Sequence, residues 1–231
     1  MKRNITLLAL ATAGMFSAAA SATSLDFRHE YKSDTKQHAS RVKMGHTFEN
    51  NLSVDLEVKF KGEEGKFMED LKSNGTEIGI NYKYQINDEW ALIPGMPIEF
   101  SNSGDTYKPQ LRLTYTPKAW DGFSISGRYR LDIKPGESNT DNGDRTLRHR
   151  YTANFGYKYE QWTFGAELNY YYSDSSDYIL YDNKRTNYEN NLTVHYKMGD
   201  WTPWVEFGDV SVDKYSSDRE LRSRVGLRYS F

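Results

Sequence analysis

The sequence contains no cysteine, and it contains no apolar stretch long enough to cross a membrane as a helix. The first absence excludes a disulfide framework and thiolate metal sites. The second excludes a membrane helix, which needs about 18 or more consecutive apolar residues. Yet 18 Tyr, 11 Phe and 5 Trp occur in a chain whose mean hydropathy is −0.82. Such an aromatic content is too high for a disordered chain, so two classes remain: a soluble antiparallel β protein and a transmembrane β-barrel.

Residues 1–22 have the three parts of a secretory signal peptide. A basic start is followed by an apolar run from Ile5 to Phe16 and by Ala20-Ser21-Ala22, which fits an A-x-A cleavage site. A short membrane anchor is disfavoured, because the apolar run is too short and small residues follow it. We therefore expect an exported chain in which residues 23–231 form a single domain.

Alternation of apolar and polar residues recurs along the rest of the chain, and no helical period competes with it. A period of two residues indicates β-strands that have one apolar face. Twelve strands are expected, at residues 25–31, 42–48, 52–60, 78–86, 90–100, 111–115, 123–133, 147–159, 162–172, 188–198, 201–207 and 221–231.

The connections between these strands alternate between long and short. Long polar loops are expected near residues 32–40, 61–76, 101–107, 134–146, 173–185 and 208–219. Long loops at one end and tight turns at the other are typical of outer-membrane barrels. Aromatic residues follow most of the short turns, which predicts an interfacial girdle and leaves ordinary core packing as the alternative. They are Trp90, Trp120, Phe123, Trp162 and Trp201.

The last twelve residues, ELRSRVGLRYSF, show what the two strand faces contact. Apolar residues alternate with Arg222, Arg224 and Arg228. In all twelve expected strands the apolar face carries no charge, whereas the other face is densely charged. Lipid outside and water inside explain both faces. The sequence therefore predicts an all-β protein, an antiparallel transmembrane β-barrel of 12 strands in the bacterial outer membrane.

The charged face places basic residues inside the barrel in two groups. In a ring of twelve strands these groups lie opposite each other across the lumen. The first strip, on the last strand and the first two, contains Arg222, Arg224, Arg228, Arg28, Arg41 and Lys43. The second strip, from residue 108 to residue 159, contains Lys108, Arg112, Arg128, Arg130, Arg148, Arg150 and Lys158, against Asp132 as its one acid.

These thirteen residues are the predicted substrate-binding residues of an anion-selective pore. Twelve strands about 4.8 Å apart and tilted by about 40° give a backbone radius of about 12 Å, which leaves a passage of roughly 8–10 Å. Repeated cationic sites attract anions without holding any one of them too firmly, and arginine binds carboxylates with two hydrogen bonds. The alternative is a non-conducting interior of salt bridges, in which Arg28 pairs with Glu30 or Glu49.

Both ends of the chain resemble a known family. The stretch SAAASATSLDFRHEYKSDTKQHASRVKMGHTFENNLSVDLEVKF and the ending ELRSRVGLRYSF are similar to those of the oligogalacturonate-specific porins of the KdgM type, which include a sialic-acid channel. The resemblance implies a monomeric outer-membrane channel for acidic oligosaccharides, surrounded by lipid and lipopolysaccharide. It also implies that the barrel-assembly machinery reads Phe231. The solute, oligogalacturonate or another acidic sugar such as sialic acid, stays open.

Other functions have less support in the sequence. No catalytic site, cofactor or metal site is expected. His29, His46 and His149 fall on the lipid-facing side, and His195 faces inward without an obvious nucleophile beside it. An acidic periphery disfavours nucleic-acid binding. A non-conducting structural or adhesin barrel remains the alternative to a channel.

Overall fold

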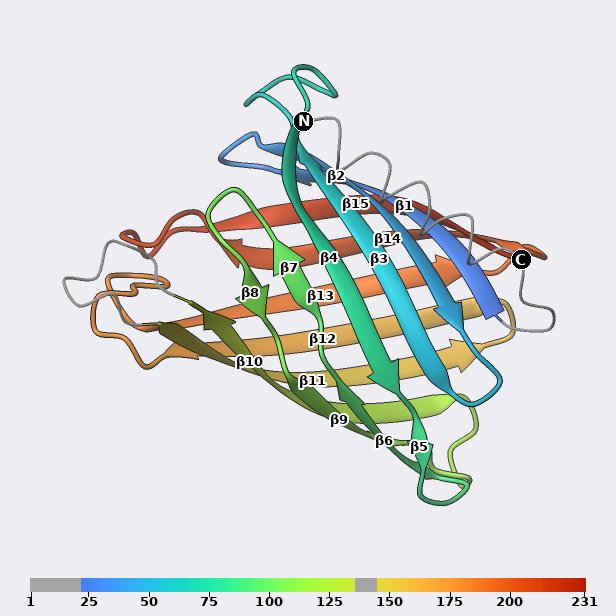
Figure 1. Ribbon diagram of the computed structural model, residues 1–231. Coiled ribbons are helices and arrows are strands. Elements are labelled where there is room, and N and C mark those ends of the chain that lie inside the picture. Colours follow the sequence, from blue (N-terminus) through green and yellow to red (C-terminus); the bar gives the residue numbers. More distant parts are fainter. Residues whose placement is uncertain (1–21, 136–144) are drawn as a thin grey trace, which may run out of the picture.

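The computed structural model describes residues 22–135 and 145–231. They form the expected closed antiparallel β-barrel of twelve strands (Figure 1). The expected signal peptide falls almost wholly outside the described ranges, and Ala22, its last expected residue, is the first residue of the first strand. In the described part of the chain, no helix is long and apolar enough to cross a membrane.

Fifteen strand segments make up the twelve barrel strands, because three of these are interrupted. The interrupted ones combine β4 with β5, β6 with β7, and β8 with β9. The segments are β1 (Ala22–Lys32), β2 (His38–Thr47), β3 (Leu52–Lys61), β4 (Lys72–Tyr82), β5 (Tyr84–Gln85), β6 (Trp90–Gly95), β7 (Ile98–Phe100), β8 (Thr106–Tyr107), β9 (Gln110–Tyr115), β10 (Phe123–Lys134), β11 (Thr146–Tyr159), β12 (Trp162–Ser173), β13 (Thr186–Tyr196), β14 (Trp201–Ser211) and β15 (Arg219–Ser230).

Prolines cause two of the three interruptions. Pro97 separates β6 from β7, and Pro109 separates β8 from β9. Proline has no N–H group and cannot donate to the hydrogen-bond ladder, although its carbonyl still accepts. The carbonyl of Pro97 accepts from the amide of Lys108 at 2.8 Å, and that of Pro109 accepts from Leu131 at 3.0 Å. The barrel wall therefore continues across both gaps.

The first and last strands close the barrel. β1 pairs with β15 in a continuous antiparallel register from Ser24 opposite Ser230 to Lys32 opposite Arg222. Figure 1 shows the blue β1 beside the red β15. On the other side, β10 pairs with both β9 and β11. In the described part of the chain, closure gives each of the twelve barrel strands a partner on both sides, which avoids the unpaired sheet edge that a bilayer would not tolerate.

Several strands are longer than their alternating segments predicted. β4 begins at Lys72 instead of residue 78, β2 begins at His38 instead of residue 42, and β14 continues to Ser211. The expected loops at 32–40, 61–76 and 208–219 are correspondingly shorter. Beyond the lipid, the outward side chains need not be apolar, so the ladder continues where the alternation has ended. The pairing of Lys61 with Lys72 is one such extension.

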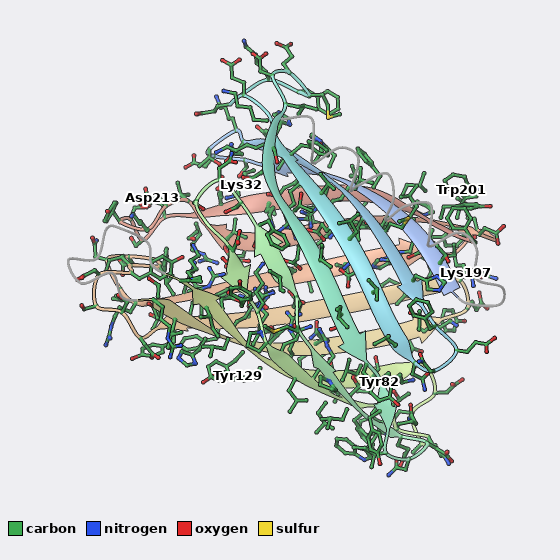
Figure 2. All side chains as sticks on the ribbon, in the orientation of Figure 1. Lys32, Tyr82, Tyr129, Lys197, Trp201 and Asp213 are labelled. Atoms are coloured by element: carbon green, nitrogen blue, oxygen red, sulfur yellow. The ribbon has the colours of Figure 1, made fainter. Side chains whose placement is uncertain are left out.

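The expected aromatic residues lie at the end of the barrel with the short turns. Trp90, Trp162 and Trp201 pack against Tyr115, Tyr196 and Tyr229, with ring centroids 4.5, 4.6 and 4.7 Å apart. Figure 2 shows Trp201 and Lys197 at this end and Asp213 at the opposite end, where the long loops are. The structure thus separates a turn end rich in aromatic rings from a loop end.

One glycine that faces the lumen leaves room for the ring of Trp204. A Cβ atom added to Gly226 of β15 would lie 2.2 Å from the ring of Trp204 on β14. We predict that Gly226→Ala lowers the stability of the barrel by about 1–3 kcal/mol, the usual cost of overpacking. The urea midpoint, followed by heat-modifiable gel mobility, measures this change.

Gly127→Ala is the matched control for Gly226→Ala, because nothing lies within 4 Å of a Cβ atom at residue 127. We expect this variant to unfold at the wild-type urea concentration. If Gly226→Ala also did so, Trp204 would not pack against the backbone of β15 as described.

Candidate functional site

The two basic strips line one cavity inside the barrel. The cavity has a volume of about 350 Å³. Arg28 and Arg224 of the first strip border it, as do Lys108, Arg130 and Arg150 of the second. The strips therefore face each other across the lumen, as the strand order predicts. The other charged residues of its wall are Glu30, Glu57, Lys59 and Glu77.

In the first strip, Asp26 holds two of the basic residues. This carboxylate, on β1, is 3% exposed. It lies 2.6 Å from a guanidinium nitrogen of Arg41 and 3.2 Å from one of Arg228. It also accepts a hydrogen bond of 3.1 Å from the indole of Trp204. One acid thus fixes side chains from β2, β14 and β15.

The remaining paired residues of the first strip use acids from other strands. Arg224 lies 2.6 Å from Glu30 and 2.5 Å from Glu206. Arg222 lies 3.5 Å from Glu189. These pairs rigidify the strip and cancel part of its charge. In addition, Lys43 lies 2.8 Å from Asp55 of β3.

The second strip has a similar arrangement around Asp132. This residue is 1% exposed and lies 2.8 Å from Arg130 and 2.5 Å from Arg148. Two further basic residues pair with acids from outside the strip. Lys108 contacts Glu77 at 2.6 Å and also contacts Glu99, and Arg150 lies 3.3 Å from Glu167. The acids that flank the strip in the ring therefore neutralise part of it.

Three arginines of the two strips have no carboxylate partner among the described residues: Arg28, Arg112 and Arg128. Arg112 donates to the hydroxyl of Ser126 at 2.8 Å, and Arg128 donates to that of Thr152 at 3.2 Å. Arg28 makes no hydrogen bond to a described residue, since Glu30 binds Arg224 instead. Among the described residues, neither Glu30 nor Glu49 forms an ion pair with Arg28. We call these three residues the unpaired arginines.

Each unpaired arginine lies directly opposite another arginine on the neighbouring strand. Arg112 of β9 faces Arg128 of β10, and Arg28 of β1 faces Arg41 of β2. Like charges directly opposite each other destabilise a sheet. An anion between two such guanidinium groups removes the repulsion and gains charge-assisted hydrogen bonds from both. The unpaired arginines are therefore the positive groups of the two strips that no described carboxylate neutralises, apart from Lys158.

One predicted residue lies away from the others. Lys158 is exposed near the end of β11, just before the turn at residues 160–161, and makes no ion pair with a described residue. Its position follows from strand length, because an inward side chain at the end of a strand reaches the rim instead of the cavity. Arg228, with its side chain 43% exposed, also lies toward this end.

The alternation did not reveal two aromatic residues that face the lumen. Trp204 lies beside the ring of His195, at 5.7 Å between centroids, and binds Asp26. The guanidinium carbons of Arg148 and Arg150 lie 5.3 Å and 5.2 Å from the centre of the Tyr171 ring. Both stand on the polar side of their strands, and that parity was the signal that could have identified them.

The histidines lie mostly where their parity placed them. His195 faces inward against Trp204. On the outer face, His29 Nδ1 lies 3.0 Å from Ser40 Oγ, and His29 Nε2 lies 3.0 Å from His38 Nδ1. Among the described residues, no group of three or more His, Asp or Glu side chains is arranged to hold a metal ion.

Comparison with known proteins connects this arrangement to a family. Residues 16–231 match the model of the family described as "Oligogalacturonate-specific porin protein (KdgM)". The chain belongs to this family. It is 36% identical to the oligogalacturonate-specific porin KdgM of Dickeya dadantii, over 98% of this chain and 99% of that protein. It is 28% identical to the N-acetylneuraminic acid outer membrane channel NanC of Escherichia coli K12, over 90% of each chain.

Solved structures of the same two relatives have the same barrel. The KdgM porin superposes with a TM-score of 0.67 at 28% identity, covering 90% of this chain and 99% of that one. The NanC porin superposes with a TM-score of 0.77 at 24% identity, which shows the shared fold. KdgM has also been solved in complex with disordered oligogalacturonate. The chain is thus an outer-membrane porin, and its lumen is the place to look for the solute.

A substitution of Asp132 tests how much the ion pairs reduce the positive charge of the lumen. We predict that Asp132→Asn makes the pore more anion-selective, because Arg130 and Arg148 lose the carboxylate that they share. The reversal potential across a salt gradient should move toward the equilibrium potential of chloride.

Asp209→Asn is the control, since Asp209 pairs at 3.0 Å with Arg219 near the loop end, outside the cavity. An unchanged reversal potential for Asp132→Asn would mean that ions do not pass these arginines.

Proposed function

We propose that this porin carries acidic oligosaccharides across the outer membrane by diffusion through an anion-selective lumen. The observation that carries the proposal is the group of unpaired arginines, one in the first strip and two in the second. Paired arginines keep the wall rigid, and unpaired ones remain able to bind a passing carboxylate. Neither a cofactor nor a resident metal has a part in this mechanism.

The electrostatics suit transport better than tight binding. A carboxylate about 5 Å from one guanidinium gains about 3 kcal/mol at an effective dielectric of about 20. Water in the lumen and nearby acids such as Glu30 and Glu167 reduce this gain. A chain with one carboxylate on each sugar can therefore exchange one contact for the next, which conduction requires. A single tight site would instead trap the solute.

Oligogalacturonate is the solute that we favour. KdgM, an oligogalacturonate-specific porin, is 36% identical to this chain, whereas the N-acetylneuraminic acid channel NanC is 28% identical. Both solutes carry carboxylates, so the strips alone accept either one. Sialic acid is therefore the second candidate. We infer that the channel is a monomer, since one barrel contains both strips.

Catalysis is the competing function with a structural feature in its favour. Ser40, His29 and His38 form a hydrogen-bonded chain on the outer face. Ser40 is only 5% exposed, and its hydroxyl also contacts the sulfur of Met68 at 3.3 Å. A nucleophile covered in this way cannot reach a substrate carbonyl. We therefore infer that these residues tie the β3–β4 connection to the barrel and that the protein is not an enzyme.

Neutralising the two facing unpaired arginines tests the proposed function. We predict that the double variant Arg112→Gln, Arg128→Gln lowers the chloride-to-potassium permeability ratio. It should also weaken current block by trigalacturonate about tenfold, which corresponds to about 1.4 kcal/mol. Planar-bilayer recordings of the refolded porin measure both quantities.

Lys118→Gln is the control variant, because Lys118 lies in the turn between β9 and β10 and pairs with Asp88 at 2.6 Å. It should keep wild-type block. A wild-type barrel that passed no current, or that preferred potassium, would overturn the proposal and favour a structural barrel.

A further inference from the structure

A second cavity lies at the loop end of the barrel. Its volume is about 440 Å³. Its wall includes Arg148 and Tyr171 from the lumen, Asp177 and Tyr178 from the β12–β13 loop, Glu189 from β13, and Lys214 from the β14–β15 loop. We propose that this cavity is a carbohydrate-acid docking site, where pyranose rings that carry a carboxylate bind before the chain enters the lumen. The proposal rests on the proposed function and deepens it.

The two loops that form the wall support each other. The amide of Asn183 donates to the carbonyl of Lys214 at 3.1 Å, and its side chain donates to the carbonyl of Tyr215 at 2.7 Å. The hydroxyl of Tyr181 donates to the carbonyl of Ser217. Figure 1 shows both loops, in orange and red, at the same end of the barrel. A wall cross-linked in this way is largely formed before any ligand arrives, which reduces the ordering cost of binding.

The lining is mainly polar and includes one short apolar segment. Tyr178, Ile179 and Leu180 supply a continuous apolar segment. A pyranose ring has a face of C–H groups that packs on such a surface and a rim of hydroxyls that requires hydrogen-bond partners. The cavity volume lies within the range of about 300–1,000 Å³ found for ligand pockets, so one or more sugar rings fit.

The charges in the cavity distinguish a sugar acid from a simple anion. Lys214 has no carboxylate partner among the described residues, and its ammonium group lies 4.9 Å from the centre of the Tyr215 ring. It can therefore bind the ligand carboxylate. Asp177 and Glu189 repel a small anion but accept hydrogen bonds from sugar hydroxyls. Only a ligand that has both a carboxylate and hydroxyls satisfies all of these groups.

Arg148 connects the cavity to the pore. It borders the cavity and also belongs to the second strip, where it pairs with Asp132. Arg150, the next inward residue on β11, borders the inner cavity. A sugar chain docked at the loop end is therefore next to the row of cations along which it would move. The strips attract any polyanion, and the docking site adds the preference for sugars.

The asymmetry of current block tests the docking site. Trigalacturonate is added to one side of a bilayer that contains oriented porin, and the association rate of block is recorded. We predict that Tyr178→Ala and Lys214→Gln each lower this rate about tenfold when the sugar is on the loop side. With sugar on the turn side, the rate should change less than twofold. Tyr178→Phe, which retains the ring, should retain most of the block.

Lys184→Gln is the matched control, because Lys184 is in the β12–β13 loop but outside the cavity and pairs with Asp182 at 2.5 Å. It removes one loop charge and should leave the rate unchanged. Heat-modifiable mobility verifies that every variant is folded. If Tyr178→Ala and Lys214→Gln both keep the wild-type rate, the docking site is wrong and the proposed function stands. If trigalacturonate does not block the wild type, both are wrong.

Discussion

The structure depends on one constraint: in a bilayer, every backbone N–H and C=O group must find a partner within the protein. The register of β1 with β15 meets it by closing the sheet. Closure divides the residues of every strand between lipid and a narrow lumen, so the chain can place charge only on the inner side. Charged side chains that would lie far apart on the surface of a soluble protein are therefore close together in the lumen. Arg28 lies opposite Arg41, and Arg112 lies opposite Arg128.

The protein neutralises these crowded charges unequally, and the proposed function rests on this inequality. Asp26 and Asp132 each hold two arginines, and acids on the flanking strands take up several more basic residues. Where no acid is within reach, the guanidinium group has only hydroxyl partners or none. The observed mixture combines a wall held by ion pairs with a few arginines that no carboxylate neutralises, and the proposed function assigns the binding of a passing anion to these arginines.

Much of this arrangement could be predicted from the alternation. It gave the closure, the strand order and the facing strips, because all three follow from counting residues along an antiparallel ring. It did not give the ion-pair partners, since these depend on how far neighbouring strands are staggered, which a single sequence does not determine. The inward positions of Trp204 and Tyr171 were missed because only the charged residues of the polar face were assigned to the lumen. The extra length of β4 was missed because its outer part is polar on both faces.

The central claim is that anions occupy the lumen at the unpaired arginines. Crystals of the porin soaked in bromide test it directly, since anomalous scattering locates the ion. The account predicts bromide between Arg112 and Arg128 and between Arg28 and Arg41, and none beside Arg228, Arg130 or Arg148, whose charge Asp26 and Asp132 neutralise. Bromide spread evenly over paired and unpaired arginines, or absent from the lumen, would contradict it.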